Sequence, residues 1–257
     1  MSDVLVGIEA GIATVTLSRP TKRNAVTLAM WRELRRVFEA FADDAAVRVV
    51  VLTGAGGHFC AGADISEFEH VRTGVEDGAA YEHAVDSLTD AITSLMKPTI
   101  AAVSGFCVGG GCGLAMACDF RVADRTAQFG IPAARLGIVY GIPDCRNLMH
   151  LVGLATAKEI LFTGRRFDAA EAQRIGFVDW LADDLEHEVA GLARTLAENA
   201  PLSIAGIKLV LQSLAAGQAE RRAADVAAAM DRAMASDDYR EAVRAFREKR
   251  RPTFTGR

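Results

Sequence analysis

The spacing of apolar and polar residues changes along the chain, and near the N-terminus it is the spacing of β-strands. Residues 4–9 and 12–18 alternate apolar and polar side chains around a two-residue connection, which is typical of a β-hairpin. Residues 47–54 and 99–105 are almost continuously apolar and end at glycine, as in strands that are covered on both faces. We therefore expect a hairpin that leads into a buried sheet.

Helical spacing separates these strands. After Thr27, a residue suited to capping, apolar side chains recur three or four positions apart and predict a helix over residues 28–42. Further helices are expected over residues 80–96 and 110–118, and the charged stretch 69–78 is interpreted as a mobile loop that covers a pocket. This alternation of strands and helices predicts an α/β fold with crossover connections.

From residue 155 onward the pattern becomes almost wholly helical, apart from a short strand expected at residues 177–181. Four amphipathic helices follow, over residues 185–198, 202–215, 220–235 and 238–249. We expect an α/β core over residues 1–195. The helical C-terminal region, residues 196–257, would pack on this core or on neighbouring subunits.

Composition narrows the possible classes of protein. The chain has 257 residues, of which 51% are hydrophobic, which suits one large domain or a core domain with an appendage. The net charge of −4 and the absence of a long basic run argue against a nucleic-acid partner. No apolar run reaches the length of a membrane span, and the N-terminus lacks the basic region of a signal peptide. We expect no membrane association.

The cysteines indicate a reducing compartment, because they form no CxxC pair and most lie in apolar surroundings. They are Cys60, Cys107, Cys112, Cys118 and Cys145. Neither these residues nor the five histidines show the spacing of a structural zinc site. We expect a cytoplasmic protein with packed thiols and no bound metal.

Two glycine-rich turns carry the candidate chemistry. The sequences GAGGHFCAGAD, from Gly54, and FCVGGGCG, from Phe106, each follow a buried strand and open a helix. Amide groups at such a point lack intrahelical partners and lie at the positive end of the helix dipole. Two turns of this kind on neighbouring strands would aim two amides at one oxygen, which is the geometry of an oxyanion hole.

Other glycine motifs fit less well. A dinucleotide-binding fingerprint would need glycine where Phe59 stands, and the Gly-Lys-Ser/Thr end of a phosphate-binding loop is absent. A nucleophile elbow around Ser104 would need glycine where Ala102 stands. A close helix–strand packing turn remains the structural alternative to the oxyanion hole.

Several longer motifs resemble one family. The segments FCAGADISEF, IAAVSGFCVGGGCGLAMACDFRVADRTAQFGIPAARLGI, TGRRFDAAEAQRIGFVDWL and FREKRRPTFTGR are similar to the crotonase superfamily, the enoyl-CoA hydratase/isomerase group. The resemblance implies a crotonase-like spiral of ββα units with a helical C-terminal region, assembled as homotrimers or dimers of trimers. It also implies a CoA thioester as the substrate, with no separate cofactor.

The resemblance also implies roles for individual residues. The oxyanion-hole donors would be the backbone amides of Ala63 and Gly110. Contacts to the adenine and pantetheine parts of CoA would fall near Arg23, Ala25, Ala61, Asp64 and Ile65.

Two positions depart from the hydratase pattern. Hydratases of the family carry two glutamates that position water and move the α-proton, and these align with Gly113 and Ala133. Isomerases with a single carboxylate often use the second position. Since general acid–base catalysis contributes roughly 10²- to 10⁴-fold, efficient enoyl-CoA hydration is not expected without a substitute group.

Candidate substitutes lie in GIVYGIPDCRNLMH, where Tyr140 and Asp144 replace the proline and glycine usual in the family. Asp144 is either a catalytic carboxylate or the N-cap of the following helix. By count from Gly153, the catalytic carboxylate of related isomerases and dehalogenases falls at Gly141 instead. Tyr140 either donates to an enolate or lines the acyl pocket. Solvated or structural roles are expected for Glu67, Glu69, His58 and His83.

Two functions remain. The first is an acyl-CoA enzyme that stabilises a thioester enolate and performs lyase or isomerase chemistry. The second is a non-catalytic acyl-CoA-binding protein that retains the fold. The distinguishing feature is whether a titratable side chain reaches the reacting carbons of the substrate.

Overall fold

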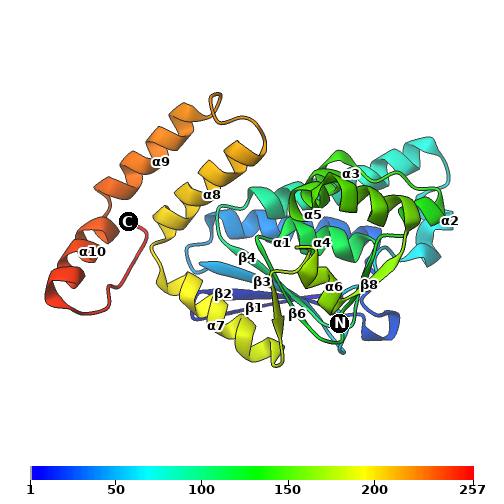
Figure 1. The fold of residues 1–257 in the computed structure, drawn as a ribbon, viewed down its shortest axis with the longest axis horizontal. Coiled ribbons are helices and arrows are strands. Elements are labelled where there is room, and N and C mark those ends of the chain that lie inside the picture. The colour runs from blue at the N-terminus through cyan, green and yellow to red at the C-terminus, as the bar shows by residue number, and fades with distance from the viewer. Residues whose placement is uncertain (1) are drawn as a thin grey trace.

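The apolar strands form a six-stranded sheet in the order β1-β2-β3-β4-β6-β9 (Figure 1). The computed structural model describes residues 2–257. The strands are β1 Val4–Glu9, β2 Ile12–Leu17, β3 Val49–Gly54, β4 Thr99–Val103, β6 Phe120–Asp124 and β9 Trp180–Ala182. The β1–β2 hairpin is antiparallel, and every other pair in this sheet is parallel.

A smaller sheet, in the order β5-β7-β8, accompanies the large one. Its strands are β5 Phe106–Val108, β7 Gln128–Gly130 and β8 Arg166–Asp168. Each has three residues, which is too short for the two-residue alternation to be visible in the sequence. These strands were not predicted, although β5 leads directly into the second glycine-rich turn.

Helices surround both sheets (Figure 1). The α-helices of the core are α1 Leu28–Asp43, α2 Phe68–Val71, α3 Val75–Ser94, α4 Gly110–Ala117, α5 Ile142–Thr163, α6 Ala169–Arg174 and α7 Leu185–Glu198. Three short 3₁₀ helices are η1 Pro20–Lys22, η2 Ile65–Glu67 and η3 Ala133–Leu136. No helix within residues 2–257 combines the length and apolar content needed to cross a bilayer.

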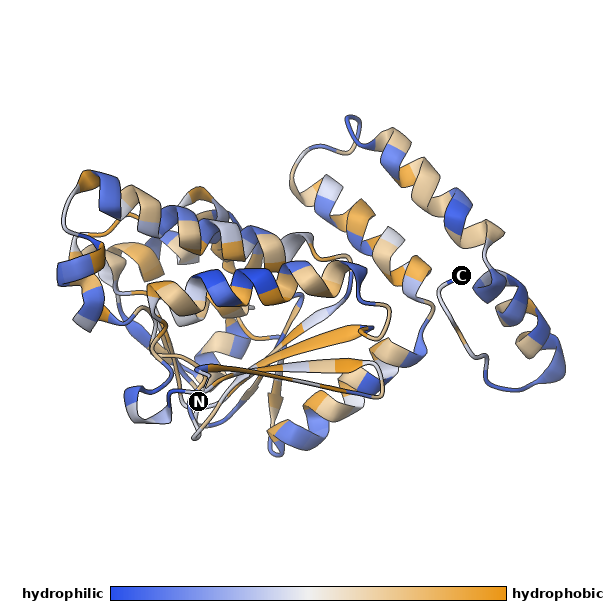
Figure 2. Cartoon of the chain, turned by 180° about the vertical axis from the view of Figure 1, so that it is seen from behind, coloured by the Kyte–Doolittle hydropathy of each residue, from blue (hydrophilic) through white to orange (hydrophobic). Residues whose placement is uncertain are grey.

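The central strand β3 is apolar throughout because both of its faces are covered. Val50 and Leu52 belong to the core cluster that includes side chains of α1, α3 and α4, whereas Val49 and Val51 pack with residues of α7 on the other face. This two-residue alternation places the helices in separate layers. Figure 2 shows strongly apolar strands and helices in which polar and apolar residues are mixed.

The last helices form a C-terminal arm, which comprises α8 Pro201–Ala215, α9 Ala223–Ala235 and α10 Asp237–Glu248. In Figure 1 this arm extends away from the sheet, and the C-terminus returns toward the start of α8. The expected boundary at residue 195 falls inside α7, which packs on the sheet. Arg48 fastens the arm to the core by donating hydrogen bonds to Asn199 O at 2.9 Å and Phe254 O at 2.8 Å.

Some local predictions were wrong. The expected loop over residues 69–78 contains most of α2 and the first turn of α3, whose N-cap is Gly74 and whose acidic first-turn residues suit the helix dipole. The expected strand at 177–181 is β9, which begins at Trp180. The expected N-cap role of Asp144 is also wrong, because Gly141 caps α5 and Asp144 lies within its first turn.

Candidate active site

A buried asparagine fixes the first glycine-rich turn. The side-chain oxygen of Asn24 accepts a hydrogen bond from Arg19 N at 2.9 Å, and its amide nitrogen donates to Ala55 O at 2.8 Å and His58 O at 2.6 Å. Arg23 and Asn24 both have positive φ, at 49° and 56°, which is uncommon for residues with side chains. The asparagine therefore holds a strained loop against the turn that leads to Ala63.

The Ala63 amide is left free by a short parallel bridge. Val26 N donates to Gly62 O at 2.8 Å, and Asp64 N donates to Val26 O at 2.9 Å. Because alternate residues of an extended segment point their amides to opposite sides, the Ala63 amide faces away from Val26. It faces the second glycine-rich turn.

Gly109 and Gly110 form the start of α4. Gly109 has φ 56° and ψ −122°, and its amide donates to Gly130 O at 2.8 Å. Gly110 is the first residue of the helix, so its amide has no intrahelical partner. A Cβ at position 110 would lie 3.0 Å from the Trp31 ring and 3.7 Å from Ala63 N. The two predicted donors are thus neighbours, and a side chain at position 110 would be in tight contact with the Trp31 ring.

A pocket of about 120 Å³ is lined by both amide-bearing residues. Its walls also include the predicted residues Ala61, Ile65, Tyr140 and Asp144. Arg23, Ala25 and Asp64 are not among the lining residues, but they lie in the adjoining loops, since Ala61 N donates to Arg23 O at 2.9 Å.

Asp144 supplies a buried carboxyl group to this pocket. The residue is 5% exposed, and its Oδ1 accepts a hydrogen bond from Thr89 Oγ1 at 3.4 Å. A Cβ at Gly113 would lie 3.0 Å from Asp144 Oδ2, so the carboxyl group occupies the space into which a side chain at position 113 would project. Burial, followed by the charge of Asp86, raises the pKa of Asp144 to about 6.

Tyr140 lies near the same glycines. Its hydroxyl oxygen would be 3.8 Å from a Cβ at Gly109, and burial raises the pKa of the phenol well above its ordinary value. Tyr140 therefore stays protonated at neutral pH. This geometry is compatible both with hydrogen-bond donation and with lining the pocket.

Sequence reasoning missed a second carboxyl group in the pocket, that of Glu82 on α3. Glu82 forms an ion pair with Arg72, whose guanidinium lies 4.8 Å from the Phe68 ring centre and 5.0 Å from that of Tyr81. Burial raises the pKa of Glu82, and the Arg72 charge opposes this shift. The available signal was an acidic row at four-residue spacing on α3, Glu82, Asp86 and Asp90.

The remaining charged candidates have structural partners. Asp64 forms an ion pair with Arg19 at 2.9 Å and caps η2 by accepting from Ser66 N. The hydrogen bond from the Ser66 hydroxyl, followed by that from Arg19, lowers its pKa. Glu67 accepts a hydrogen bond from Leu28 N at 2.5 Å. Arg23 is exposed and places its guanidinium 4.7 Å from the centre of the Phe106 ring.

The candidate histidine and the thiols are also packed. His58 Nδ1 accepts a hydrogen bond from Phe106 N at 3.3 Å, so it is not the solvated side chain that was expected. Four of the five cysteines are buried, and burial raises the pKa of the Cys60 thiol to about 12. Such thiols remain protonated, which is consistent with the expected packing role.

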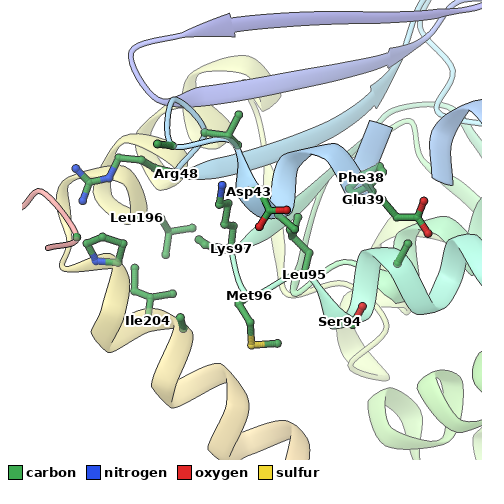
Figure 3. A pocket seen from close by; sticks show the side chains of 18 of the residues that line it. Phe38, Glu39, Asp43, Arg48, Ser94, Leu95, Met96, Lys97, Leu196 and Ile204 are labelled. Atoms are coloured by element: carbon green, nitrogen blue, oxygen red, sulfur yellow. The ribbon is translucent and has the colours of Figure 1, made fainter. Parts of the chain in front are cut away.

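A larger hollow of about 880 Å³ lies elsewhere, at the base of the C-terminal arm (Figure 3). The two cationic residues labelled in Figure 3, Arg48 and Lys97, already have hydrogen-bond partners. Arg48 donates to Asn199 O and Phe254 O, and Lys97 Nζ donates to Asp44 O at 2.6 Å. Neither of the two glycine-rich turns contributes to its lining. The smaller pocket, which both glycine-rich turns line, is therefore the candidate active site.

Comparison with known proteins shows the family of the chain. A family model described as enoyl-CoA hydratase/isomerase matches residues 7–257. The chain belongs to the enoyl-CoA hydratase/isomerase family. The short-chain-enoyl-CoA hydratase of Clostridium acetobutylicum is 35% identical to it over 257 residues, covering 98% of this chain and 97% of that protein. The 2,3-dehydroadipyl-CoA hydratase of Escherichia coli is 34% identical over 264 residues and covers 100% of both chains.

Solved structures confirm the expected α/β fold for this enoyl-CoA hydratase/isomerase family member. An enoyl-CoA hydratase/isomerase family protein from Hyphomonas neptunium matches with a TM-score of 0.95 and 34% identity, covering 100% of this chain and 98% of that chain. An enoyl-CoA hydratase/carnithine racemase from Magnetospirillum magneticum matches with a TM-score of 0.91 and 35% identity, covering 100% of this chain and 97% of that chain. The predicted family resemblance is confirmed.

Proposed function

We propose that this family member is an acyl-CoA enzyme that stabilises a thioester enolate and uses Asp144 as its acid–base group. One observation carries the proposal. The Asp144 carboxyl group lies 3.0 Å from the Cβ position of residue 113, in the pocket that also contains the Ala63 and Gly110 amides. A carboxyl group from another helix therefore stands beside the position where hydratases of the family carry a glutamate.

The chemistry follows from these groups. The amides of Ala63 and Gly110 would donate to the thioester oxygen and hold the negative charge that develops there. Asp144 would remove a proton from Cα and give an enolate. Returning this proton to Cγ of a 3-enoyl-CoA gives the 2-enoyl isomer, so one carboxyl group is sufficient for isomerisation. A pKa near 6 suits both acceptance and return of the proton at neutral pH.

The substrate is proposed to be a CoA thioester, and the reaction needs no separate cofactor. The loops that contain Arg23, Ala25, Ala61, Asp64 and Ile65 would hold the CoA part. Arg23 supports this assignment because its exposed guanidinium forms no ion pair within residues 2–257. Tyr140 would line the acyl site beside Asp144 and donate a hydrogen bond to the enolate where the acyl group allows it.

The names of the relatives support water addition, whereas Gly113 and Ala133 argue against its efficiency. We therefore expect crotonyl-CoA hydration to be slow compared with isomerisation of a 3-enoyl-CoA. A non-catalytic acyl-CoA-binding protein is the competing function, and the location of Asp144 in the pocket disfavours it.

A panel of thioesters tests the proposal. The wild type should isomerise 3-enoyl-CoA, and Asp144→Asn should lose at least about 100-fold in rate while CoA binding is retained. Binding without turnover across the panel would establish the binding protein instead. Rapid crotonyl-CoA hydration that survives Asp144→Asn would show that the assigned carboxyl group is wrong.

A homotrimer or dimer of trimers is proposed for the assembly. The C-terminal arm supports it with exposed apolar side chains, among them Ile207, Leu211, Leu214, Met230, Met234 and Phe246. Phe246 is 86% exposed, and unpartnered apolar surface of this kind is typical of contact sites. Light scattering should give three or six times the chain mass of 27.4 kDa, and a monomeric mass would refute the proposal.

A further inference from the structure

The candidate active site contains two carboxyl groups from different helices. Asp144 comes from the first turn of α5, and Glu82 comes from the first half of α3. Both line the pocket that holds the Ala63 and Gly110 amides. The negative charge of Glu82 is close enough to contribute to the raised pKa of Asp144.

We infer that Glu82 is a second catalytic carboxyl group, which holds and deprotonates the water that adds to Cβ of a 2-enoyl-CoA. The inference rests on the proposed function, since it assumes that Asp144 and the two amides handle Cα and the thioester oxygen. Glu82 would thereby extend the chemistry from isomerisation to reversible water addition.

The surroundings of Glu82 support a chemical role. The partner cation Arg72 is held by the Phe68 and Tyr81 rings, and Tyr81 Oη in turn accepts a hydrogen bond from Trp31 Nε1 at 2.8 Å. These residues all line the pocket. The Glu82–Arg72 ion pair therefore lies in the cavity beside the free amides, a position that it would not need if its only role were to hold α3 in place.

The charged groups around Glu82 and around Asp144 differ, and they suit the two carboxyl groups to different roles. Asp144 is surrounded by the acidic groups of α3, namely Asp86, Glu82 and Asp90, and has no cationic partner within residues 2–257. Glu82 has Arg72, with Asp86 one helical turn away. Burial raises the pKa of Glu82, but the Arg72 cation opposes this rise and suits Glu82 to act as a base, while Asp144, which lacks a cation, can more readily hold the proton that is delivered to Cα.

The proposed addition balances in atoms and protons. The Glu82 carboxylate takes one proton from water as the water oxygen bonds to Cβ, and the electrons of the Cα–Cβ double bond move into the thioester to give the enolate. Protonated Asp144 then delivers its proton to Cα, and the product is a 3-hydroxyacyl-CoA. Glu82 ends protonated and Asp144 ionised, and exchange with solvent restores both groups. Dehydration follows the same steps in reverse.

Two assays separate the roles of the two carboxyl groups. Exchange of the α-protons of butyryl-CoA in D₂O, followed by mass spectrometry, requires only Asp144 and the amides. Dehydration of 3-hydroxybutyryl-CoA, followed by absorbance, requires Glu82 as well. Both are measured on the full-length protein for the wild type, Glu82→Gln, Arg72→Gln and the control Glu76→Gln, which changes an exposed residue at the start of α3. Circular dichroism checks that each variant is folded.

The expected result is selective. Glu82→Gln should slow dehydration by about 100-fold or more and leave α-proton exchange within about threefold of the wild type. Glu76→Gln should change neither rate. Arg72→Gln should keep dehydration activity but move its pH profile upward, because loss of the nearby cation raises the pKa of Glu82.

Other outcomes would overturn the inference in distinguishable ways. Unchanged dehydration in Glu82→Gln, or exchange without any dehydration in the wild type, would remove Glu82 from catalysis and leave the proposed function intact. Equal losses in Glu82→Gln and Arg72→Gln without a pH shift would show that Glu82 only holds Arg72. Absence of α-proton exchange in the wild type would refute the proposed function and this inference together.

Discussion

Replacing Asp144 by asparagine should make the stability of the protein less dependent on pH. Burial raises the pKa of this carboxyl group from 3.8 to about 6 in the folded state. Between these two values the folded chain therefore binds more protons than the unfolded chain, so stability falls as the pH rises. Asparagine keeps the size of the side chain and an oxygen that can accept from Thr89, but it carries no charge to bury.

The magnitude follows from the difference between the two pKa values. A difference of about two units corresponds to roughly 3 kcal/mol, since each unit is worth about 1.4 kcal/mol. The penalty is small, about 0.5 kcal/mol, at pH 4, where the folded group is protonated and the unfolded group about half ionised, and it is nearly complete above about pH 7. Asp144→Asn should thus resemble the wild type in stability at pH 4 and exceed it by about 3 kcal/mol at pH 7.5.

Urea unfolding at several pH values between 4 and 8 measures this effect. The protein concentration must stay constant, because assembly would otherwise change the apparent stability. Asp231→Asn is the control, since Asp231 is exposed on α9 and its loss should leave the pH dependence nearly unchanged. A stability difference between Asp144→Asn and the wild type that does not vary with pH would refute the reasoning about burial.

Substitutions at three further positions test the geometry of the pocket and of the loop beside it. Gly110→Pro and Gly110→Ala both place a Cβ 3.0 Å from the Trp31 ring, but only proline removes the amide, so isomerisation should be at least about 100-fold slower in the proline variant than in the alanine variant. Gly113→Glu should destabilise the fold by about 3 kcal/mol, because it forces a second carboxyl group against Asp144. The double variant Gly113→Glu/Asp144→Gly should recover most of that loss, as measured by urea unfolding. Asn24→Ala removes three hydrogen bonds to the backbone and should cost about 2–4 kcal/mol by the same measurement; a cost below about 0.5 kcal/mol would show that the loop is held by other contacts.

Predictions from the sequence succeeded where local pattern and burial coincide. Thr27 caps α1 by accepting a hydrogen bond from Met30 N, and β3 is apolar because helices cover both of its faces. The three-residue strands β5, β7 and β8 were not predicted, because their ends are defined by pairing with distant segments. Their residues give no periodic signal of their own.

The candidate site was predicted only in part, for a related reason. Glycine spacing indicated two turns with free amides, because free amides at a helix start are a local property, and the family resemblance then implied Ala63 and Gly110 as the donors. The contact between Asp144 and Gly113 joins residues 31 positions apart and depends on how α5 packs beside α4. Glu82 was missed because its acidic row on α3 fits a solvated helix face as well as a pocket wall, and only the packing of α3 decides between the two.

The burial of α4 has a consequence for redesign. Residues 111–117 are all buried, and a Cβ at Gly111 would lie 2.4 Å from Cys60 O, so this helix tolerates little change in volume. The groups that would move protons, by contrast, sit on α3 and α5 and line the pocket. A redesign for new reactivity should therefore leave the residues of α4 unchanged and substitute pocket residues on α3 and α5.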